Sequence, residues 1–442
     1  MPANILNLPA FTVTDIQETE FDYHISAETN TGQPLCPHCD SDNLVGFGRN
    51  EQLIRDLPTH GKRTGIYMNT RRYKCRSCGK TFYERLPGVD DKRLMTTRLV
   101  KWMGEQSISR PFSHVADDIG VTVNTVKNVF NDHIEVLGRT VRFKTPQWMG
   151  IDEIHIIKKP RCVVTNIEEH TIVNMLGDRE KKTVISYLSR LDGSRDIKCV
   201  TMDMWPTYRD AVRHVMPQAT IVVDKFHVLR LANQCLETVR KGIRGNLTQK
   251  QRRGLMHDRF ILLRREKELE GMDSITLESW TRNFPALGAA YRAKEDFYAI
   301  YDLLERRDAE EMFRRWAAKL DPEIQEDFHP LVRAVNNWMP EIMTYFDHPL
   351  TNAYTESLNN LIRSANRIGR GYSFEALRAK ILYTRGVAKI KKPKFKRPPK
   401  ESTNTEYMAL TTVGPSTFST GPEENYGADI PTLVRLIEAG EF

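Results

Sequence analysis

Residues 352–363, NAYTESLNNLIR, combine an apolar stripe and a polar face in one helical pattern. At helical spacing the apolar stripe consists of Tyr354, Leu358, Leu361, Ile362 and Ala365. The other face carries one carboxylate, one guanidinium and two amides, from Glu356, Arg363, Asn352 and Asn359. Asparagine is a poor helix former, and a solvated helix face is more often rich in lysine and glutamate. The polar face therefore indicates a functional site.

Two earlier β-rich runs each carry an acid. Residues 148–157, WMGIDEIHII, contain Asp152, and residues 197–206, IKCVTMDMWP, contain Asp203 just before a helix start. Unpaired carboxylates are rare in buried strands, because removing the charge from water is costly. Together with Glu356, the two aspartates are expected to bind a pair of divalent cations, Mg²⁺ or Mn²⁺.

The composition favours a polyanionic partner. The 442 residues include 65 Lys and Arg against 57 Asp and Glu, so the net charge is +8. A merely basic protein would share this balance. No stretch approaches the roughly 18 apolar residues of a membrane span. The first residues lack the basic segment and apolar core of a secretory signal. We therefore expect a cytoplasmic protein with no membrane partner.

Four of the seven cysteines form two CxxC pairs. Two residues between the cysteines of a pair let both thiolates reach one ion, and two such pairs complete a four-sulfur site. This pattern of cysteines fits reduced thiols that bind a metal in the cytoplasm better than it fits disulfides. The sequence predicts structural Zn²⁺ bound by Cys36, Cys39, Cys75 and Cys78, with a β-hairpin between the pairs.

Residues 113–127, SHVADDIGVTVNTVK, have the spacing of a helix-turn-helix. Ala116 lets two helices approach, Gly120 permits the sharp turn, and Val126 fills the core. An ordinary helical hairpin is the alternative, and the adjoining zinc module favours DNA binding. In these two modules the expected DNA contacts are Arg71, Arg72, Lys74, Thr122, Asn124, Thr125, Lys127 and Asn128.

The next part of the chain switches to a mixed β/α pattern. Strands are expected at 148–157, 161–168, 171–177, 197–203 and 219–224, and helices at about 180–190 and 206–215. This is the order of an RNase H-like fold, in which the first and fourth strands carry acids side by side. Glu153 is the alternative to Asp152, but its side chain would point to the opposite sheet face.

Residues 220–228, TIVVDKFHV, end a further strand on an acid. His227 follows Asp224 by three residues, so both lie on one helical face. An aspartate cap beside a partly buried histidine is the structural interpretation. A catalytic role is the alternative, because strand ends on this sheet would surround the cations.

A helix-rich, charged segment precedes Glu356, and an arginine-rich segment with flexible glycines follows it. A helix is expected at about 374–385. The Lys/Pro-rich run at 389–400 is expected to be a tether. We assign no role to the acidic tail that follows it. The expected DNA contacts in this part of the chain are Asn359, Arg363, Arg367 and Arg370.

The order of these motifs resembles the ISL-three family of bacterial insertion-sequence transposases, which have an acidic DDE triad. The motifs are the two CxxC pairs, the helix-turn-helix, GIDE at 150–153, MDMWP at 202–206, DKFH at 224–227 and NxxxExxN at 352–359. The resemblance covers roughly residues 30–390. It implies a triad of Asp152, Asp203 and Glu356. Asp224 and His227 match a (C/D)xxH signature shared with hAT- and Mutator-like transposases.

The resemblance implies a DDE transposase. It would bind the terminal inverted repeats of an insertion sequence and catalyse cleavage and strand transfer on double-stranded DNA, including target DNA. Two ends must be joined, so a homodimer or higher oligomer on DNA is expected, associated with a bacterial nucleoid. The alternatives are a zinc-dependent transcription regulator and an RNase H-like structure-specific nuclease.

The predicted fold class is multidomain α+β, with an RNase H-like core interrupted by an all-α insertion. The expected segments are an N-terminal segment, 1–30; a zinc-ribbon-like finger, 31–88; a helix-turn-helix domain, 89–145; the first part of the core, 146–230; the helical insertion, 231–345; the final part of the core, 346–390; and a basic tether and acidic tail, 391–442.

Overall fold

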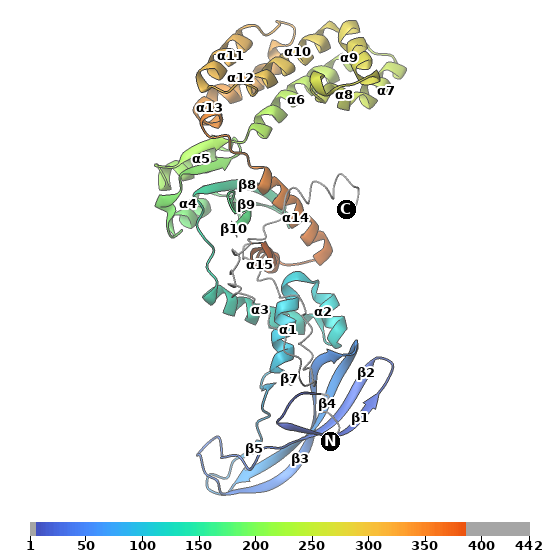
Figure 1. The fold of residues 1–442 in the computed structure, drawn as a ribbon, viewed down its shortest axis with the longest axis vertical. Coiled ribbons are helices and arrows are strands. Elements are labelled where there is room, and N and C mark those ends of the chain that lie inside the picture. The colour runs from blue at the N-terminus through green and yellow to red at the C-terminus, as the bar shows by residue number, and fades with distance from the viewer. Residues whose placement is uncertain (1–5, 386–442) are drawn as a thin grey trace, which may run out of the picture. The chain divides into compact units, whose positions relative to one another are not determined.

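The computed structural model describes residues 6–385, and the expected tether and tail lie outside them. Contacts within the chain divide it into two compact units. The first runs from the N-terminus to Arg142 and includes Ser364–Thr384, and the second contains Phe143–Arg363. The boundary within the later part of the chain falls inside one helix, α14 (Ala353–Gly369). Figure 1 labels most of the elements of both units.

The first unit begins with a β-sheet. Its strands are β1 (Phe11–Glu18), β2 (Asp22–Thr29), β3 (Leu44–Thr59), β4 (Lys62–Cys75), β5 (Thr81–Tyr83), β6 (Val89–Asp90) and β7 (Met95–Thr96). The order is β1-β2-β4-β3-β7-β6, with β5 paired to β4. The expected hairpin is the long β3–β4 pair, which turns at His60 and Gly61 with φ of 50° and 79°.

Strands β1 and β2 lie in a segment for which the sequence analysis predicted no structure. In β2, Tyr23, Ile25 and Ala27 are buried in alternation and join Ile54 and Ile66 in the core of this sheet. That period of two is the signature of a half-buried strand. The signal was therefore present in the sequence.

The helices of the first unit are α1 (Thr97–Ser109), α2 (Phe112–Ile119), α3 (Val123–Thr140) and α15 (Phe374–Arg385). Between α2 and α3, Gly120 adopts φ 73°, a left-handed conformation that glycine tolerates. Ala116 and Val126 are buried, as the helix-turn-helix spacing predicted. The side chain of Thr122 caps α3 by accepting a hydrogen bond from the Thr125 backbone N–H, at 3.2 Å.

Helix α15, from the far end of the chain, packs into this helical core through Lys380. The Lys380 ammonium is buried and donates hydrogen bonds to the backbone carbonyls of Ser107 and Arg110, the latter at 2.9 Å. Burial lowers the pKa of Lys380 to about 7. Three aromatic rings surround the ammonium, with centroids at 4.3, 4.9 and 5.4 Å, from Phe112, Tyr372 and Phe130.

The second unit contains a five-stranded mixed sheet. Its strands are β8 (Trp148–Ile156), β9 (Lys159–Asn166), β10 (Thr171–Met175), β11 (Cys199–Met202) and β12 (Thr220–Val223), in the order β10-β9-β8-β11-β12. β8, β9 and β10 run antiparallel, whereas β11 and β12 are parallel to β8. Helices α4 (Lys181–Ser189) and α5 (Pro206–Val215) supply apolar side chains to its core.

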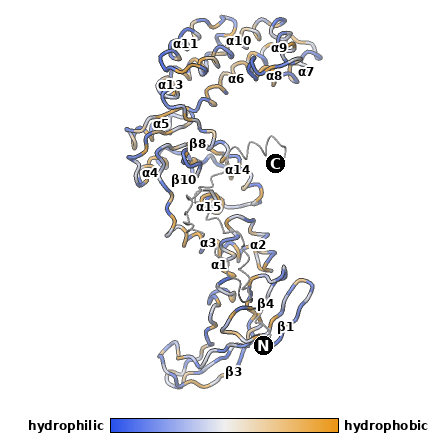
Figure 2. The backbone as a smooth tube through the Cα atoms, in the orientation of Figure 1, coloured by the Kyte–Doolittle hydropathy of each residue, from blue (hydrophilic) through white to orange (hydrophobic). Residues whose placement is uncertain are grey.

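A helical segment follows β12 and precedes α14. It comprises α6 (Lys225–Gly242), α7 (Gln249–His257), α8 (Arg259–Leu263), α9 (Met272–Asn283), α10 (Pro285–Ile300), α11 (Arg306–Ala318), α12 (Gln325–Asn337) and α13 (Met339–Asp347). Its helices mix hydrophobic and hydrophilic stretches along the chain (Figure 2). The aromatic rings of Phe297, Phe313, Trp316 and Phe328 lie at the centre of their shared core. None of the helices in residues 6–385 is both long and apolar enough to cross a membrane.

We predict that Lys380→Ala destabilises the full chain by about 2–4 kcal/mol, because the carbonyls of Ser107 and Arg110 lose their donor and three rings lose a cation. Urea denaturation followed by circular dichroism measures the change. Lys101→Ala, an exposed lysine on α1, is the control and is expected to shift stability by less than about 0.5 kcal/mol. Equal midpoints for the two variants would show that Lys380 does not hold α15 in place.

Candidate active site and zinc cluster

Three acids lie in one row across neighbouring strands of the second unit. Met202 of β11 pairs with Ile151 of β8 and with Val223 of β12. The residues that follow these three are Asp152, Asp203 and Asp224. Because the three strands are parallel, the acids lie at the same level of the sheet, and adjacent strands are about 4.8 Å apart. The register of the sheet therefore brings together acids that are far apart in the sequence.

His227 connects this row to Glu356. Its Nδ1 lies 3.1 Å from Asp203 Oδ2, and its Nε2 lies 3.2 Å from Glu356 Oε1. His227 belongs to the first turn of α6, and Glu356 belongs to the first turn of α14. The imidazole thus links Glu356 to Asp203, which lies beside Asp152 in the row of strand acids.

Helix α14 also fixes the orientation of Asp152. Asn359 Nδ2 donates to Asp152 Oδ2 at 2.7 Å, and the Glu153 backbone N–H donates to Asp152 Oδ1 at 2.6 Å. Asn359 is 3% exposed. The predicted DNA contact of Asn359 is wrong, because its side chain is buried against the Asp152 carboxylate. The amide periodicity of this helix could not separate these two roles, because the difference depends on which face packs on the sheet.

A buried polar network holds the start of α14 against the sheet. The Thr355 hydroxyl lies 2.8 Å from the Thr165 hydroxyl of β9 and donates to Asn352 Oδ1 at 2.5 Å. Asn352 Nδ2 donates to the Ile151 carbonyl of β8 at 3.4 Å. A Cβ on Gly150 would come within 2.7 Å of both Asn352 Oδ1 and Thr355 Oγ1. Glycine at this position therefore allows the helix to dock.

The site carries excess negative charge. Burial, and then the charge of Asp203, raise the pKa of the Asp152 carboxyl to about 8. Burial raises the pKa of Asp224 to about 6. Burial alone would lower the pKa of His227, but its hydrogen bond to Asp203 and the surrounding carboxylates outweigh that effect and raise the pKa to about 9. Each shift indicates that added positive charge would stabilise the cluster.

The oxygen atoms of this cluster fit divalent cations. Three buried oxygens accept no hydrogen bond from residues 6–385, namely Asp203 Oδ1, Asp224 Oδ2 and Asn359 Oδ1. A buried acceptor without a partner costs free energy, so these atoms suit a bound cation or water. Ligand atoms of Asp224, His227 and Glu356 also lie within 4.8 Å of one another. Carboxylate and amide oxygens are the ligands that Mg²⁺ and Mn²⁺ prefer.

Glu153 follows Asp152 in β8, so its side chain lies on the opposite face of the sheet from that of Asp152, as the alternation along a strand predicted. It forms an ion pair with Arg179, whose guanidinium lies 4.5 Å from the ring centroid of Trp205. Neither Arg179 nor Trp205 was among the predicted site residues. Trp205 follows Asp203 by two residues in the sequence. Nothing in the local sequence connects Trp205 or Glu153 to Arg179.

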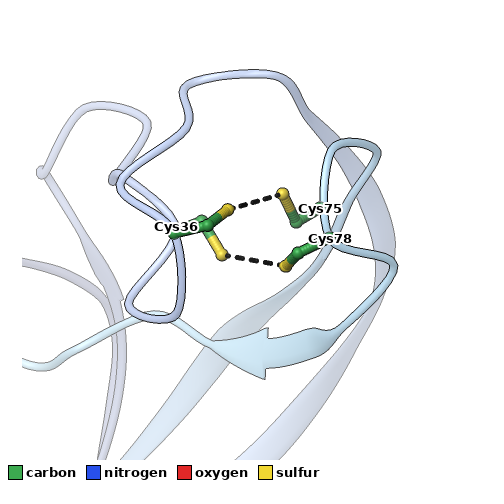
Figure 3. Close-up of side chains that lie close together, drawn as sticks. Cys36, Cys75 and Cys78 are labelled. Atoms are coloured by element: carbon green, nitrogen blue, oxygen red, sulfur yellow. Dashed lines mark hydrogen bonds between the residues drawn. The ribbon is translucent and has the colours of Figure 1, made fainter.

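The four predicted zinc ligands form a second cluster, in the first unit. The side chains of Cys36, Cys75 and Cys78 point toward one another (Figure 3). The sulfurs of Cys36 and Cys78 are 3.7 Å apart, and those of Cys39 and Cys75 are 3.6 Å apart. Four sulfurs about 2.3 Å from one zinc in a tetrahedron lie about 3.8 Å from each other. The cluster therefore has the donor set and spacing of a structural zinc site.

Three family models match successive parts of the chain. One, described as the zinc-finger of transposase IS204/IS1001/IS1096/IS1165, matches residues 32–78. A second, the helix-turn-helix domain of transposase family ISL3, matches residues 84–134. A third, the ISL3 transposase model, matches residues 149–381 and so covers more than half of the 442 residues. The chain belongs to the ISL3 family of transposases.

Two curated relatives illustrate this membership. The transposase for insertion sequence element IS1001 of Bordetella parapertussis is 22% identical over 345 residues, which cover 76% of this chain and 85% of the relative. The transposase for insertion sequence element IS1557 of Mycobacterium tuberculosis is 24% identical over 263 residues, which cover 53% of this chain and 59% of the relative. The resemblance read from the motifs is thus confirmed, together with the zinc finger and the helix-turn-helix.

Within the helix-turn-helix of this ISL3 transposase, the expected DNA contacts lie at the start of α3. Asn124, Lys127 and Asn128 are exposed, whereas Thr125 is half-buried and hydrogen-bonds Thr122. These positions suit a helix that enters a DNA groove by its first turns.

In the zinc finger, the three predicted basic contacts differ in their surroundings. Arg71 donates to the buried Glu84 carboxylate at 2.7 Å, so its guanidinium stabilises the sheet. The Arg72 guanidinium lies 5.2 Å from the ring of Phe47, and the exposed Lys74 ammonium lies 5.9 Å from it. Arg72 and Lys74 therefore remain proposed DNA contacts, as do the exposed Arg363, Arg367 and Arg370 of the α14 region.

We predict that Asn359→Ala weakens binding of Mn²⁺ to the full chain by about 10- to 100-fold, because the Asp152 carboxylate loses the amide that orients it. Titration calorimetry measures the affinity. The matched control is Asn360→Ala, the exposed neighbour on the same helix, with affinity expected to match the wild type. Equal affinities for all three proteins would exclude an orienting role for Asn359.

We predict that the purified chain contains zinc and that Cys78→Ser loses it, because three remaining thiolates hold the ion less tightly. Elemental analysis measures the metal. Cobalt substitution is expected to produce the absorption of tetrahedral thiolate ligation in the wild type. Cys199→Ala, which removes a buried thiol outside the cluster, is expected to retain zinc. Zinc loss from both variants would mean that the effect is not specific to the cluster.

Proposed function

We propose that this ISL3 transposase is a DDE enzyme that binds terminal inverted repeats and catalyses metal-dependent cleavage and strand transfer on DNA. The observation that carries the proposal is the contact of His227 with both Asp203 and Glu356, in line with the row of strand acids. These contacts support one shared site for three acids from separate parts of the chain. A regulator that only binds DNA has no use for such a cluster.

In this proposal Asp152, Asp203 and Glu356 hold two divalent cations, Mg²⁺ or Mn²⁺. When bound, the cations supply activation of a water or 3′-hydroxyl and stabilise the leaving oxygen of an in-line displacement at phosphorus. The protein side chains set the geometry of that chemistry. Asn359 keeps one Asp152 oxygen in place, and the His227 imidazole, which lies between Asp203 and Glu356, would contact the scissile phosphate.

The sheet topology supports an RNase H-like core. Three antiparallel strands, β8, β9 and β10, precede two strands parallel to β8, and the acids lie on the first and fourth strands in sequence. This is the order on which the fold prediction rested. In this assignment the segment from α6 to α13 is the all-α insertion before the last acid.

The N-terminal modules are proposed to recognise the ends of the element. The helix-turn-helix would read base edges with Asn124 and Asn128, while Lys127, Arg72 and Lys74 would contact phosphates. Joining two ends requires at least a dimer on DNA, in the cytoplasm of a bacterium and associated with its nucleoid.

We predict that Asp152→Asn, Asp203→Asn and Glu356→Gln each abolish strand cleavage and leave end binding intact, because each removes a metal ligand but no DNA contact. Cleavage of a labelled terminal repeat with Mg²⁺ or Mn²⁺ measures activity, and a gel shift measures binding. The control is Asp210→Asn, an exposed acid on α5 paired with Lys181, which is expected to cleave normally. Cleavage at the wild-type rate by any triad variant would remove that residue from the metal site.

A further inference from the structure

A cavity of about 300 Å³ opens directly beside the acid cluster. It is lined by Trp205, Tyr208, His227, Arg230, Leu231 and Gln234, together with Glu153, Asp203 and Met204. The volume is at the lower limit for pockets that hold a small molecule. Asp203 and His227 belong both to this wall and to the acid cluster, so an occupant would lie next to the reacting phosphate.

We propose that this cavity receives a nucleobase, unstacked from the nucleotide that adjoins the cleaved phosphate. The inference rests on the proposed function, because it requires DNA at the acids. It assigns to Trp205 and to one face of α6 a role in positioning the substrate, which the metal-binding residues do not provide.

The chemistry of the walls matches a base. Trp205 is 37% exposed at the N-terminus of α5, and an exposed indole offers a stacking surface that accepts any of the four bases. Leu231 and Met204 add apolar area. Arg230 and Gln234 offer a hydrogen-bonding edge, and Arg230 forms no ion pair with residues 6–385. A nucleobase is a flat ring with a polar rim. It can therefore stack on the indole and hydrogen-bond to Arg230 and Gln234.

The indole is braced from outside the cavity. The Arg179 guanidinium lies 4.5 Å from the Trp205 ring centroid, and Arg179 does not line the cavity. Glu153 holds Arg179 by an ion pair. Because a guanidinium stacked on an indole is attracted to its ring face, this pair restrains the ring at the edge of the acid cluster.

The opposite wall comes from one face of α6. His227, Arg230, Leu231 and Gln234 follow at spacings of three, four and seven residues, which place them on the same side of the helix. The face begins at His227, next to the acids, and continues away from them with polar side chains. A base entering beside His227 would therefore meet both the indole and the polar groups of α6.

The test uses the full chain with a terminal-repeat duplex carrying 2-aminopurine at each position next to the cleavage site. Ca²⁺ replaces Mg²⁺ so that DNA binds without being cut. The expected result is a several-fold rise in fluorescence at one position, because unstacking relieves quenching. Trp205→Ala is expected to lose the rise, and Trp205→Phe is expected to retain much of it.

Cleavage with Mg²⁺ provides the second measurement. Trp205→Ala is expected to cut the intact repeat about 10- to 100-fold more slowly than the wild type, since one base loses its stacking partner. On a repeat with an abasic nucleotide at the responsive position, the two proteins are expected to cut at equal rates. Gln234→Trp, which fills the cavity from an exposed position of α6, is expected to lose the fluorescence rise as well.

The matched control is Trp148→Ala. Trp148 is 39% exposed, lies at the start of β8 and does not line the cavity, so its variant is expected to behave like the wild type. A wild type that cleaves the repeat with no rise at any flanking position would overturn the nucleobase pocket and leave the transposase assignment standing. A wild type without metal-dependent cleavage would overturn both.

Discussion

The second unit depends on a buried cluster of side-chain oxygens between a helix and a sheet. Asn352 and Thr355 are both fully buried, and the Thr355 hydroxyl donates to Asn352. Thr355 also hydrogen-bonds Thr165 of β9, and Asn352 donates to the Ile151 carbonyl of β8. An unsatisfied polar group at this depth would cost free energy, so only the docked helix meets the requirements of all these groups. The contact sets the position of Glu356, one residue beyond Thr355. The carboxylate proposed to be catalytic is thus positioned by neighbours for which no chemical role is proposed.

The same helix restricts the aspartates. A carboxylate in a crowded, poorly hydrated site would rotate or protonate to escape repulsion, and the raised pKa of Asp152 shows this pressure. Asn359 opposes rotation by binding one oxygen, and His227 opposes repulsion by placing an imidazole between Asp203 and Glu356. With these contacts made, Asn359 Oδ1 and Asp203 Oδ1 are buried acceptors that bond to no described residue, so both suit a cation.

Sequence periodicity predicted the parts of this protein that depend on local physics. The acid-bearing strands, the helix opened by Pro206, the turn at Gly120 and the two CxxC pairs follow from propensity, turn chemistry and ligand spacing. Contacts between distant segments were not predictable in this way. Lys380 attaches α15 to helices more than 250 positions earlier, and Asn359 faces Asp152, because tertiary packing decides which helical face is buried. Strand β2 was not predicted, although its sequence alternates apolar and polar residues as a half-buried strand does.

Asp224 shows why a structural and a chemical interpretation need not compete. One oxygen accepts the Phe226 backbone N–H at 3.2 Å and so caps α6, as the structural interpretation expected. The other oxygen is buried and accepts no hydrogen bond from the described residues. Because the cap starts the helix at Lys225, it also sets His227 at the first turn, facing Asp203. The capping hydrogen bond therefore fixes the residue that connects the strand acids to Glu356, and a single carboxylate serves both the fold and the site.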